Sequence, residues 1–135
     1  MQKLTTFLMF EGKAEAAMNF YISLFKDSAI ISIKRNDKGD MGAENSVQHA
    51  TFTLAGQQFM CIDSPPVHGF TFTPAMSIYV SCKSEQEIKI LFEKLSAGGS
   101  VLMPLGTYPF SDRYAWVTDQ FGVAWQLNFG TLNQV

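Results

Sequence analysis

The sequence has few of the features that mark nucleic-acid-binding or disulfide-stabilised proteins. Ten Lys and Arg residues against twelve Asp and Glu residues give a formal charge of -2, and no stretch concentrates the basic residues. A nucleic-acid backbone would find no electrostatic partner on such a chain, so no nucleic-acid partner is expected. The only two cysteines, Cys61 and Cys82, lie far apart, which is typical of reduced thiols in the cytoplasm.

Long apolar runs are lacking as well. The longest apolar stretches, such as Phe7–Phe10, are far shorter than the ~20 residues that span a bilayer. The N-terminal residues Met1–Leu4 lack the charged and apolar regions of a secretory signal. We therefore expect a cytoplasmic protein with no membrane partner.

The chain does have the apolar content of a globular domain. Of its 135 residues, 47% are hydrophobic, 13% are aromatic and 16% are charged, which excludes disorder. A chain of this size typically forms one domain and buries roughly two thirds of the surface it exposes when unfolded. A single domain over residues 1–135 is predicted.

Hydrophobic periodicity predicts the same order of elements twice. A strand over Leu4–Phe10 and a helix over Lys13–Phe25 precede strands over Ile30–Arg35, Val47–Leu54 and Gln58–Asp63. A strand over Ala75–Cys82 and a helix opened by the capping box of Ser84 and Glu87 precede strands over Val101–Leu105, Tyr114–Thr118 and Val123–Phe129. The repeated order favours two modules, about residues 1–73 and about residues 74–135.

Alternation along the strands sorts their side chains onto two faces. The face predicted to pack against the helices is apolar: Phe7, Met9, Phe52, Leu54, Met76, Ile78, Val80, Trp125, Leu127 and Phe129. The opposite face is mixed: Thr6, Leu8, Phe10, His49, Thr51, Met60, Ser77, Tyr79, Gln126 and Asn128. A mixed face is typical of a ligand pocket and equally of the solvent side of a sheet, and alternation leaves both open.

Motifs for nucleophilic or phosphate chemistry are missing. The sequence has no G-x-S-x-G turn, and its glycine-rich segment Gly39–Gly42 has no lysine. Of the two histidines, His49 is either a ligand-orienting group or general base, or a strand histidine bonded to a neighbour. His68 either closes over a pocket or is an exposed loop residue. Tyr79, Tyr114 and Trp116 are candidates for stacking on a ligand or for plain packing.

Four segments carry a resemblance to a known family: Thr5–Phe10, Phe20–Phe25, Phe70–Ala75 and Asp119–Gln126. With the repeated order of elements, they resemble the vicinal-oxygen-chelate superfamily of glyoxalase, bleomycin-resistance and dioxygenase proteins. Within it they are similar to the PhnB-like, or 3-demethylubiquinone-9 3-methyltransferase-like, branch. Over essentially the whole chain, the resemblance implies an α+β fold in which two βαβββ modules form a curved mixed sheet around a cavity, with the helices on the outer face. It also implies a homodimer.

The resemblance bears on cofactors too. Metalloenzymes of the superfamily carry His or Glu ligands at positions that correspond here to Thr6, about Met60, Ala75 and Gln126. None of these four side chains is a good ligand for a divalent metal. A nucleotide-bearing methyl donor would need a glycine-rich loop after a strand, which is also missing. The resemblance therefore implies neither a metal nor another cofactor.

The expected function is binding of a small, partly apolar molecule in the cavity, without metal chemistry. The predicted pocket residues are Thr6, Leu8, His49, Met60, His68, Ser77, Tyr79, Tyr114, Trp116 and Gln126. The alternative is a glyoxalase- or dioxygenase-like enzyme that acts on a small carbonyl or phenolic substrate, with His49 as the catalytic general base. A third possibility is a cavity filled by core side chains, in a protein that serves by association.

Overall fold

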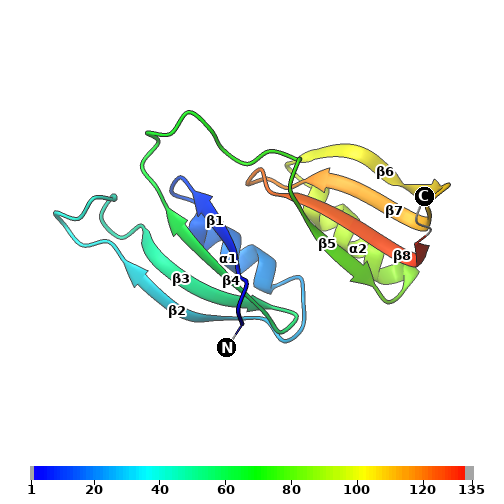
Figure 1. The fold of residues 1–135 in the computed structure, drawn as a ribbon, viewed down its shortest axis with the longest axis horizontal. Coiled ribbons are helices and arrows are strands. Elements are labelled where there is room, and N and C mark those ends of the chain that lie inside the picture. The colour runs from blue at the N-terminus through cyan, green and yellow to red at the C-terminus, as the bar shows by residue number, and fades with distance from the viewer. Residues whose placement is uncertain (1, 133–135) are drawn as a thin grey trace. The chain divides into compact units, whose positions relative to one another are not determined.

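The chain forms two compact units that adjoin in sequence between Thr71 and Phe72. The computed structural model describes residues 2–132, and each unit in it holds one four-stranded sheet and one helix (Figure 1). The predicted α+β class and the two βαβββ modules are confirmed. The strands form two separate mixed sheets, one in each module.

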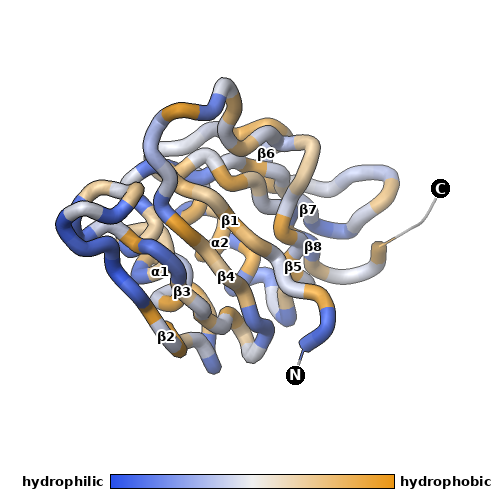
Figure 2. The backbone as a smooth tube through the Cα atoms, turned by 60° about the vertical axis from the view of Figure 1, so that its left-hand side comes forward, coloured by the Kyte–Doolittle hydropathy of each residue, from blue (hydrophilic) through white to orange (hydrophobic). Residues whose placement is uncertain are grey.

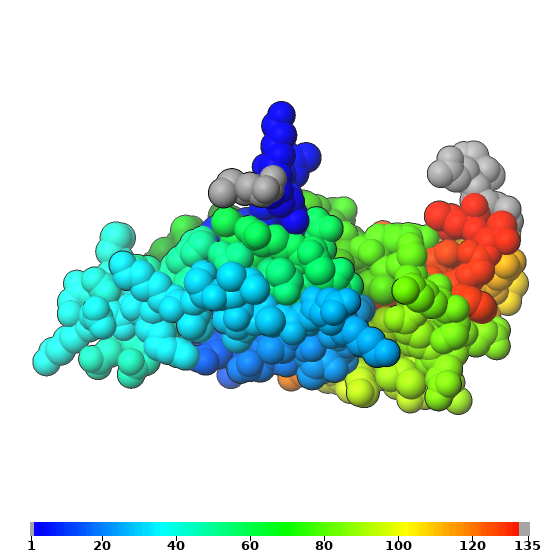
Figure 3. Space-filling model, turned by 90° about the horizontal axis from the view of Figure 1, so that it is seen from below, coloured from blue at the N-terminus to red at the C-terminus, as the bar shows by residue number. Residues whose placement is uncertain are grey.

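The first unit contains β1 (Thr6–Phe10), α1 (Ala14–Ile22), β2 (Ala29–Arg35), β3 (Val47–Leu54) and β4 (Gln57–Asp63). Its sheet has the order β1-β4-β3-β2, in which β1 runs parallel to β4 and the other neighbours are antiparallel. The polar segment that joins β2 to β3 is coloured hydrophilic in Figure 2. It lies at the surface in Figure 3, and its Met41 is 99% exposed.

The second unit repeats this plan with β5 (Ser77–Cys82), α2 (Glu85–Ser96), β6 (Ser100–Tyr108), β7 (Ser111–Thr118) and β8 (Ala124–Leu132). Its sheet has the order β5-β8-β7-β6, with β5 parallel to β8. The strands β6, β7 and β8 are all longer than predicted. β6 continues past Gly106 to pair with β7 as far as Ser111, and Ser111 in turn pairs with Leu132 of β8. Among residues 2–132, neither helix is long and apolar enough to cross a bilayer.

Helix α2 begins with a capping box. At the start of α2, Ser84 Oγ accepts a bond from Glu87 N at 3.0 Å, and Glu87 Oε1 accepts one from Lys83 N at 2.6 Å. This reciprocal pair confirms the predicted capping box.

Helix α1 ends in a tighter turn, in which the amides of Ser23 and Leu24 bond to carbonyls three residues back rather than four. The tighter turn ends α1 at Ile22, before the predicted Phe25.

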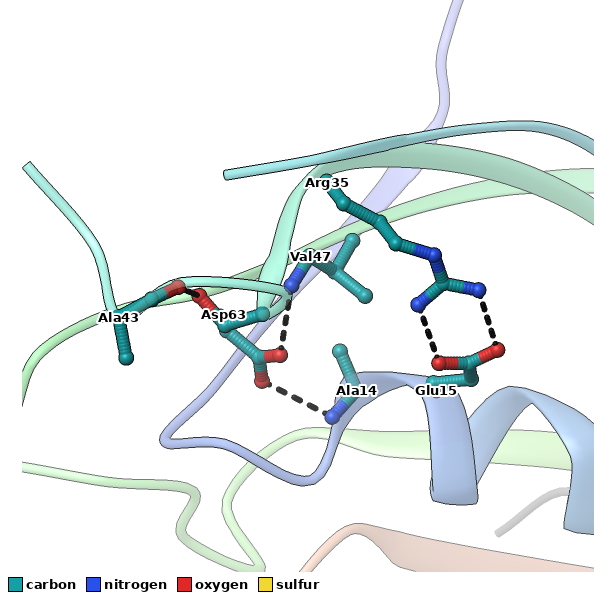
Figure 4. A network of polar contacts seen from close by, with 7 residues as sticks. Ala14, Glu15, Arg35, Ala43, Val47 and Asp63 are labelled. Atoms are coloured by element: carbon teal, nitrogen blue, oxygen red, sulfur yellow. Dashed lines mark hydrogen bonds and ion pairs between the residues drawn. The ribbon is translucent and has the colours of Figure 1, made fainter. Parts of the chain in front are cut away.

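An aspartate from another strand caps α1. Lys13, which precedes the helix, makes no side-chain cap. Instead, Asp63 Oδ1 accepts bonds from the amides of Gly12 and Ala14, both at 2.9 Å. Asp63 Oδ2 accepts one from Val47 N at 3.0 Å, and Figure 4 shows the bonds of Asp63 to Ala14 and Val47. One carboxylate at the end of β4 thus fixes the start of α1 and the start of β3.

The predicted faces are confirmed for most strands and wrong for β1. Phe52, Trp125 and Leu127 are fully buried, as predicted. In β1, however, Leu8 and Phe10 are 7% and 3% exposed, whereas Phe7 is 51% exposed. The register with β4 places Leu8 beside the buried Cys61 on the helix side of the sheet.

One further core prediction is wrong. Met76 is 80% exposed because β5 begins one residue later, at Ser77. Met76 therefore lies outside the strand, and strand alternation does not assign its side chain to either face of the sheet.

Candidate functional site

The second sheet presents one face away from its helix, which we call the open face. On the helix side, Ala115, Val117, Trp125 and Leu127 are completely buried, and α2 contacts all four strands. Strand alternation then places the intervening side chains on the open face. The register assigns to it Ser77, Tyr79 and Ser81 of β5, Ala124, Gln126 and Asn128 of β8, Tyr114, Trp116 and Thr118 of β7, and Met103 of β6.

Three of the predicted pocket residues lie in one row across this face. Gln126 of β8 is the direct partner of Tyr79 on β5 and of Trp116 on β7. Side chains that are direct partners in neighbouring strands lie within about 5.5 Å of one another at their β-carbons. An amide is therefore flanked by two aromatic rings. Tyr79 is 43% exposed, and Gln126 and Trp116 are partly exposed, so the row is accessible.

A fourth predicted residue, Tyr114, fixes the central amide. Its hydroxyl donates a hydrogen bond to Gln126 Oε1 at 2.5 Å. The Tyr114 ring is 5% exposed and meets Tyr108 and Phe110 edge to face, at centroid distances of 5.7 and 4.9 Å. This packing fixes the orientation of the Tyr114 ring, and the hydrogen bond from its hydroxyl in turn fixes the orientation of the Gln126 amide.

Burial also sets the protonation of the two tyrosines. Desolvation raises the pKa of Tyr114 above its ordinary value, and the neighbouring Tyr79 and Tyr108 raise it further. Desolvation and the nearby Cys82 likewise raise the pKa of Tyr79. Both hydroxyls therefore keep their protons at neutral pH and are available as donors.

Trp116 carries a buried donor without an acceptor. Its Nε1 is shielded from solvent, and residues 2–132 supply no hydrogen-bond partner for it. An unpaired buried donor costs about 1–3 kcal/mol of stability. The donor therefore stands out as a feature that folding alone does not explain.

The predicted pocket residues of the first unit divide between two faces. Met60 is the direct partner of Phe7 on β1 and of Thr51 on β3, on the side of the sheet away from α1. His49 is exposed on β3, with its ring 6.3 Å from that of Phe7. Thr6 and Leu8 lie on the opposite, helix side, so placing them on one face with His49 and Met60 was wrong.

Neither histidine has the surroundings of a catalytic base. Nothing in the described part of the chain forms a hydrogen bond or ion pair with His49, so no second group orients its imidazole. His68 is exposed in the segment after β4 and stacks on Phe70, with ring centroids 5.3 Å apart.

The cysteines are also unsuited to chemistry. Desolvation raises the pKa of the Cys61 thiol to about 12, and Asp63 adds to the shift. Desolvation and the nearby Glu87 raise the pKa of Cys82 to about 12. At neutral pH both thiols are protonated, and the thiolate is the nucleophilic form.

The residues present do not fit a divalent metal or a nucleotide-bearing methyl donor. Within residues 2–132, no group of three or more His, Cys, Asp or Glu side chains could hold a metal ion. At the start of α1 the amides of Gly12 and Ala14 bond to Asp63, and at the start of α2 the amides of Lys83 and Glu87 bond to the Glu87 and Ser84 side chains. The chain thus places its own acceptor oxygens at the two helix starts, where a phosphate group would bind.

Sequence reasoning missed three parts of this site. Tyr108 and Phe110, which hold Tyr114, both lie beyond the predicted strand end at Leu105: Tyr108 ends β6, and Phe110 lies in the turn that follows. Met103 was placed in that strand but not on a face. A signal was available in the spacing Tyr108, Phe110, Tyr114, which concentrates aromatic residues on both sides of a short turn.

Comparison with known proteins agrees with this architecture. The family described as 3-demethylubiquinone-9 3-methyltransferase matches residues 2–128. A Bacillus cereus structure described as 3-demethylubiquinone-9 3-methyltransferase, PhnB protein, is 61% identical, with 96% of this chain and 100% of that chain covered and a TM-score of 0.93. A Pseudomonas aeruginosa protein is 26% identical, with 96% and 98% covered and a TM-score of 0.82.

More distant structures share the fold alone. The fosfomycin resistance protein FosX of Listeria monocytogenes is 16% identical, with 98% of this chain and 95% of that chain covered and a TM-score of 0.61. No curated protein matches the chain.

Proposed function

Because the chain belongs to the 3-demethylubiquinone-9 3-methyltransferase family, whose PhnB member it resembles closely and whose fold is that of the vicinal-oxygen-chelate proteins, we propose that it binds a small, partly apolar molecule without metal chemistry. The proposed site is the open face of the second sheet. The methyltransferase in the family's description is not part of the proposal, since the sequence has no glycine-rich loop after a strand to hold a nucleotide-bearing methyl donor.

The row of Tyr79, Gln126 and Trp116 carries this proposal. Small-molecule sites combine apolar walls with a few polar groups that fix the ligand's orientation. Two accessible aromatic rings on either side of one tethered amide supply both elements. A sheet face that served only as a solvent surface would not require the amide to be held by a buried tyrosine.

Thermal unfolding in the presence of small aromatic compounds, both neutral and cationic, tests the proposal. A ligand that binds only the folded chain raises the unfolding temperature. We expect at least one such compound, and we expect Tyr79→Ala to abolish its effect. Ile90→Ala is the matched control, because Ile90 is 40% exposed on α2 and Tyr79 is 43% exposed on the open face. Failure of every compound, or an undiminished effect in Tyr79→Ala, would overturn the proposal.

The enzyme with His49 as general base has less support. A general base needs a proton within reach and usually a second group that orients it, and His49 has no such group among the described residues. The homodimer and the cytoplasmic location remain predictions from the sequence. Sedimentation equilibrium tests the homodimer, and a monomer at all concentrations would refute it.

A further inference from the structure

We infer that the open face selects neutral, flat-ringed ligands that carry a hydrogen-bond acceptor, and that Tyr114 imposes this selection by fixing the direction of the Gln126 amide. The inference rests on the proposed function and adds the chemical class of the ligand. It also assigns Tyr114 a positioning role, since this residue acts on the ligand through Gln126.

The first step is the direction of the hydrogen bond between Tyr114 and Gln126. The Tyr114 hydroxyl keeps its proton, and it lies 2.5 Å from Gln126 Oε1. A carbonyl oxygen only accepts, so the hydroxyl is the donor. Turning the amide over would replace this bond with one in which the hydroxyl accepts from Nε2 and needs another acceptor for its own proton. The described part of the chain gives the Tyr114 hydroxyl no other acceptor.

The second step is what the amide then offers to a ligand. With Oε1 engaged by Tyr114, Gln126 presents the two N–H groups of Nε2, for which residues 2–132 provide no acceptor. Gln126 therefore presents donors only to the open face, and the group that satisfies them is an acceptor.

The third step concerns charge and shape. No Asp, Glu, Lys, Arg or His is among the residues that the register assigns to the open face. An ionised ligand would lose its hydration there without gaining a counter-charge, which is unfavourable. Tyr79 and Trp116 on either side of the amide provide aromatic surfaces suited to a flat ring. A neutral heteroaromatic or aryl carbonyl compound meets all three conditions.

Three probes of similar size and shape test the inference. Quinoline carries one ring acceptor, naphthalene carries no polar group, and indole carries one donor. Titrations at neutral pH are followed by the NMR signals of the Gln126 side-chain amide and the Trp116 indole N–H. Quinoline is expected to bind about fivefold more tightly than naphthalene, the value of one net hydrogen bond. Indole is expected to bind no more tightly than naphthalene, and quinoline alone should move the Gln126 amide signals downfield.

Variants then separate positioning from packing. In Tyr114→Phe the amide can turn its oxygen outward, so the advantage of quinoline should fall to twofold or less while indole binding improves. Tyr108→Phe is the matched control, because the Tyr108 hydroxyl donates to Pro104 O at 2.6 Å and not to Gln126. It should keep the fivefold preference. Gln126→Glu replaces the two donors with acceptors, so the preference for quinoline should reverse to a preference for indole. This variant keeps the test available if Tyr114→Phe fails to fold.

The outcomes distinguish the inference from the proposed function. Equal binding of quinoline and naphthalene overturns the inference and leaves the proposed function standing, as does an unchanged preference in Gln126→Glu. Binding of none of the three probes, together with no stabilising compound in the thermal test, overturns both.

Discussion

Asp119 is expected to be a main source of stability in the second unit. Its side chain is 3% exposed at the turn between β7 and β8. Oδ1 accepts hydrogen bonds from the amides of Phe121 and Val123 at 2.8 and 3.1 Å, and Oδ2 accepts one from Trp125 Nε1 at 2.8 Å. One carboxylate therefore holds the turn and also the largest completely buried side chain.

The cost of Asp119→Ala follows from the donors that it would leave unpaired. The Val123 amide and the Trp125 indole N–H belong to residues that are 4% and 0% exposed, so water cannot replace the lost acceptor without opening the unit. The Phe121 amide is less buried and recovers a bond to water. At about 1–3 kcal/mol for each buried orphan, the two sum to about 4 kcal/mol. This is a large part of the ~5–15 kcal/mol that typically stabilises a domain.

Tryptophan fluorescence during urea unfolding measures this loss of stability in the second unit. Both tryptophans, Trp116 and Trp125, lie in the second unit. Asp119→Ala should lower the urea midpoint with little change in slope. Asp119→Asn should cost about half as much, because its carbonyl oxygen still accepts while its NH2 group faces a donor.

The control for Asp119→Ala is a carboxylate that lies exposed in the same unit. Asp112→Ala removes an exposed carboxylate whose Oδ2 accepts from Thr131 N at 2.8 Å, and it should cost less than about 1 kcal/mol because water replaces it. If Asp119→Ala costs no more than Asp112→Ala, buried hydrogen bonds to the carboxylate do not stabilise this turn as argued.

Three other expectations follow from the structure. Cys61 and Cys82 should resist a thiol reagent such as Ellman's in the native chain and react once urea unfolds it, since burial raises both pKa values to about 12; rapid native reaction would contradict this. Glu15→Gln should destabilise the chain slightly, because the exposed bond to Arg35 lowers the pKa of Glu15. That stabilisation is present above the unfolded pKa and lost as the pH falls through the lowered one, so a difference between wild type and variant that persists at acidic pH or in high salt would refute it. Gly99→Ala should cost at least about 2 kcal/mol in urea unfolding, since a β-carbon there would overlap the backbone at the end of β7; unchanged stability would show that this backbone yields easily.

The sequence predicts the order of elements well because the two periodicities are clear. Ile88, Leu91 and Leu95 mark the buried stripe of α2, and Ser84 with Glu87 marks its start. β1 is different. Its residues Thr6–Phe10 include four apolar side chains in succession, so alternation cannot distinguish the covered face from the other one. Only the pairing with β4 decides it.

The sequence singled out Tyr79, Tyr114, Trp116 and Gln126 individually but not their arrangement. Alternation places Tyr79 and Gln126 on one face, yet only the parallel register of β5 with β8 makes them partners. The bond from Tyr114 to Gln126 depends on side-chain lengths and on the packing of Phe110. Such contacts arise from three strands brought together by the fold, and local sequence patterns do not encode them.

The parallel pairing of β1 with β4 has a consequence for the nascent chain. Each residue of β1 is paired with a strand that is translated only after α1, β2 and β3 have been made. Until then Leu8 and Phe10 have no sheet to join, and contacts between distant segments form slowly. A ribosome that pauses before β4 would thus hold an unpaired apolar strand, the kind of segment that aggregates or is captured by chaperones. Once β4 emerges, the first sheet has all its strands while the C-terminal strands of the second unit are still to come, so synthesis separates the assembly of the two similar units in time.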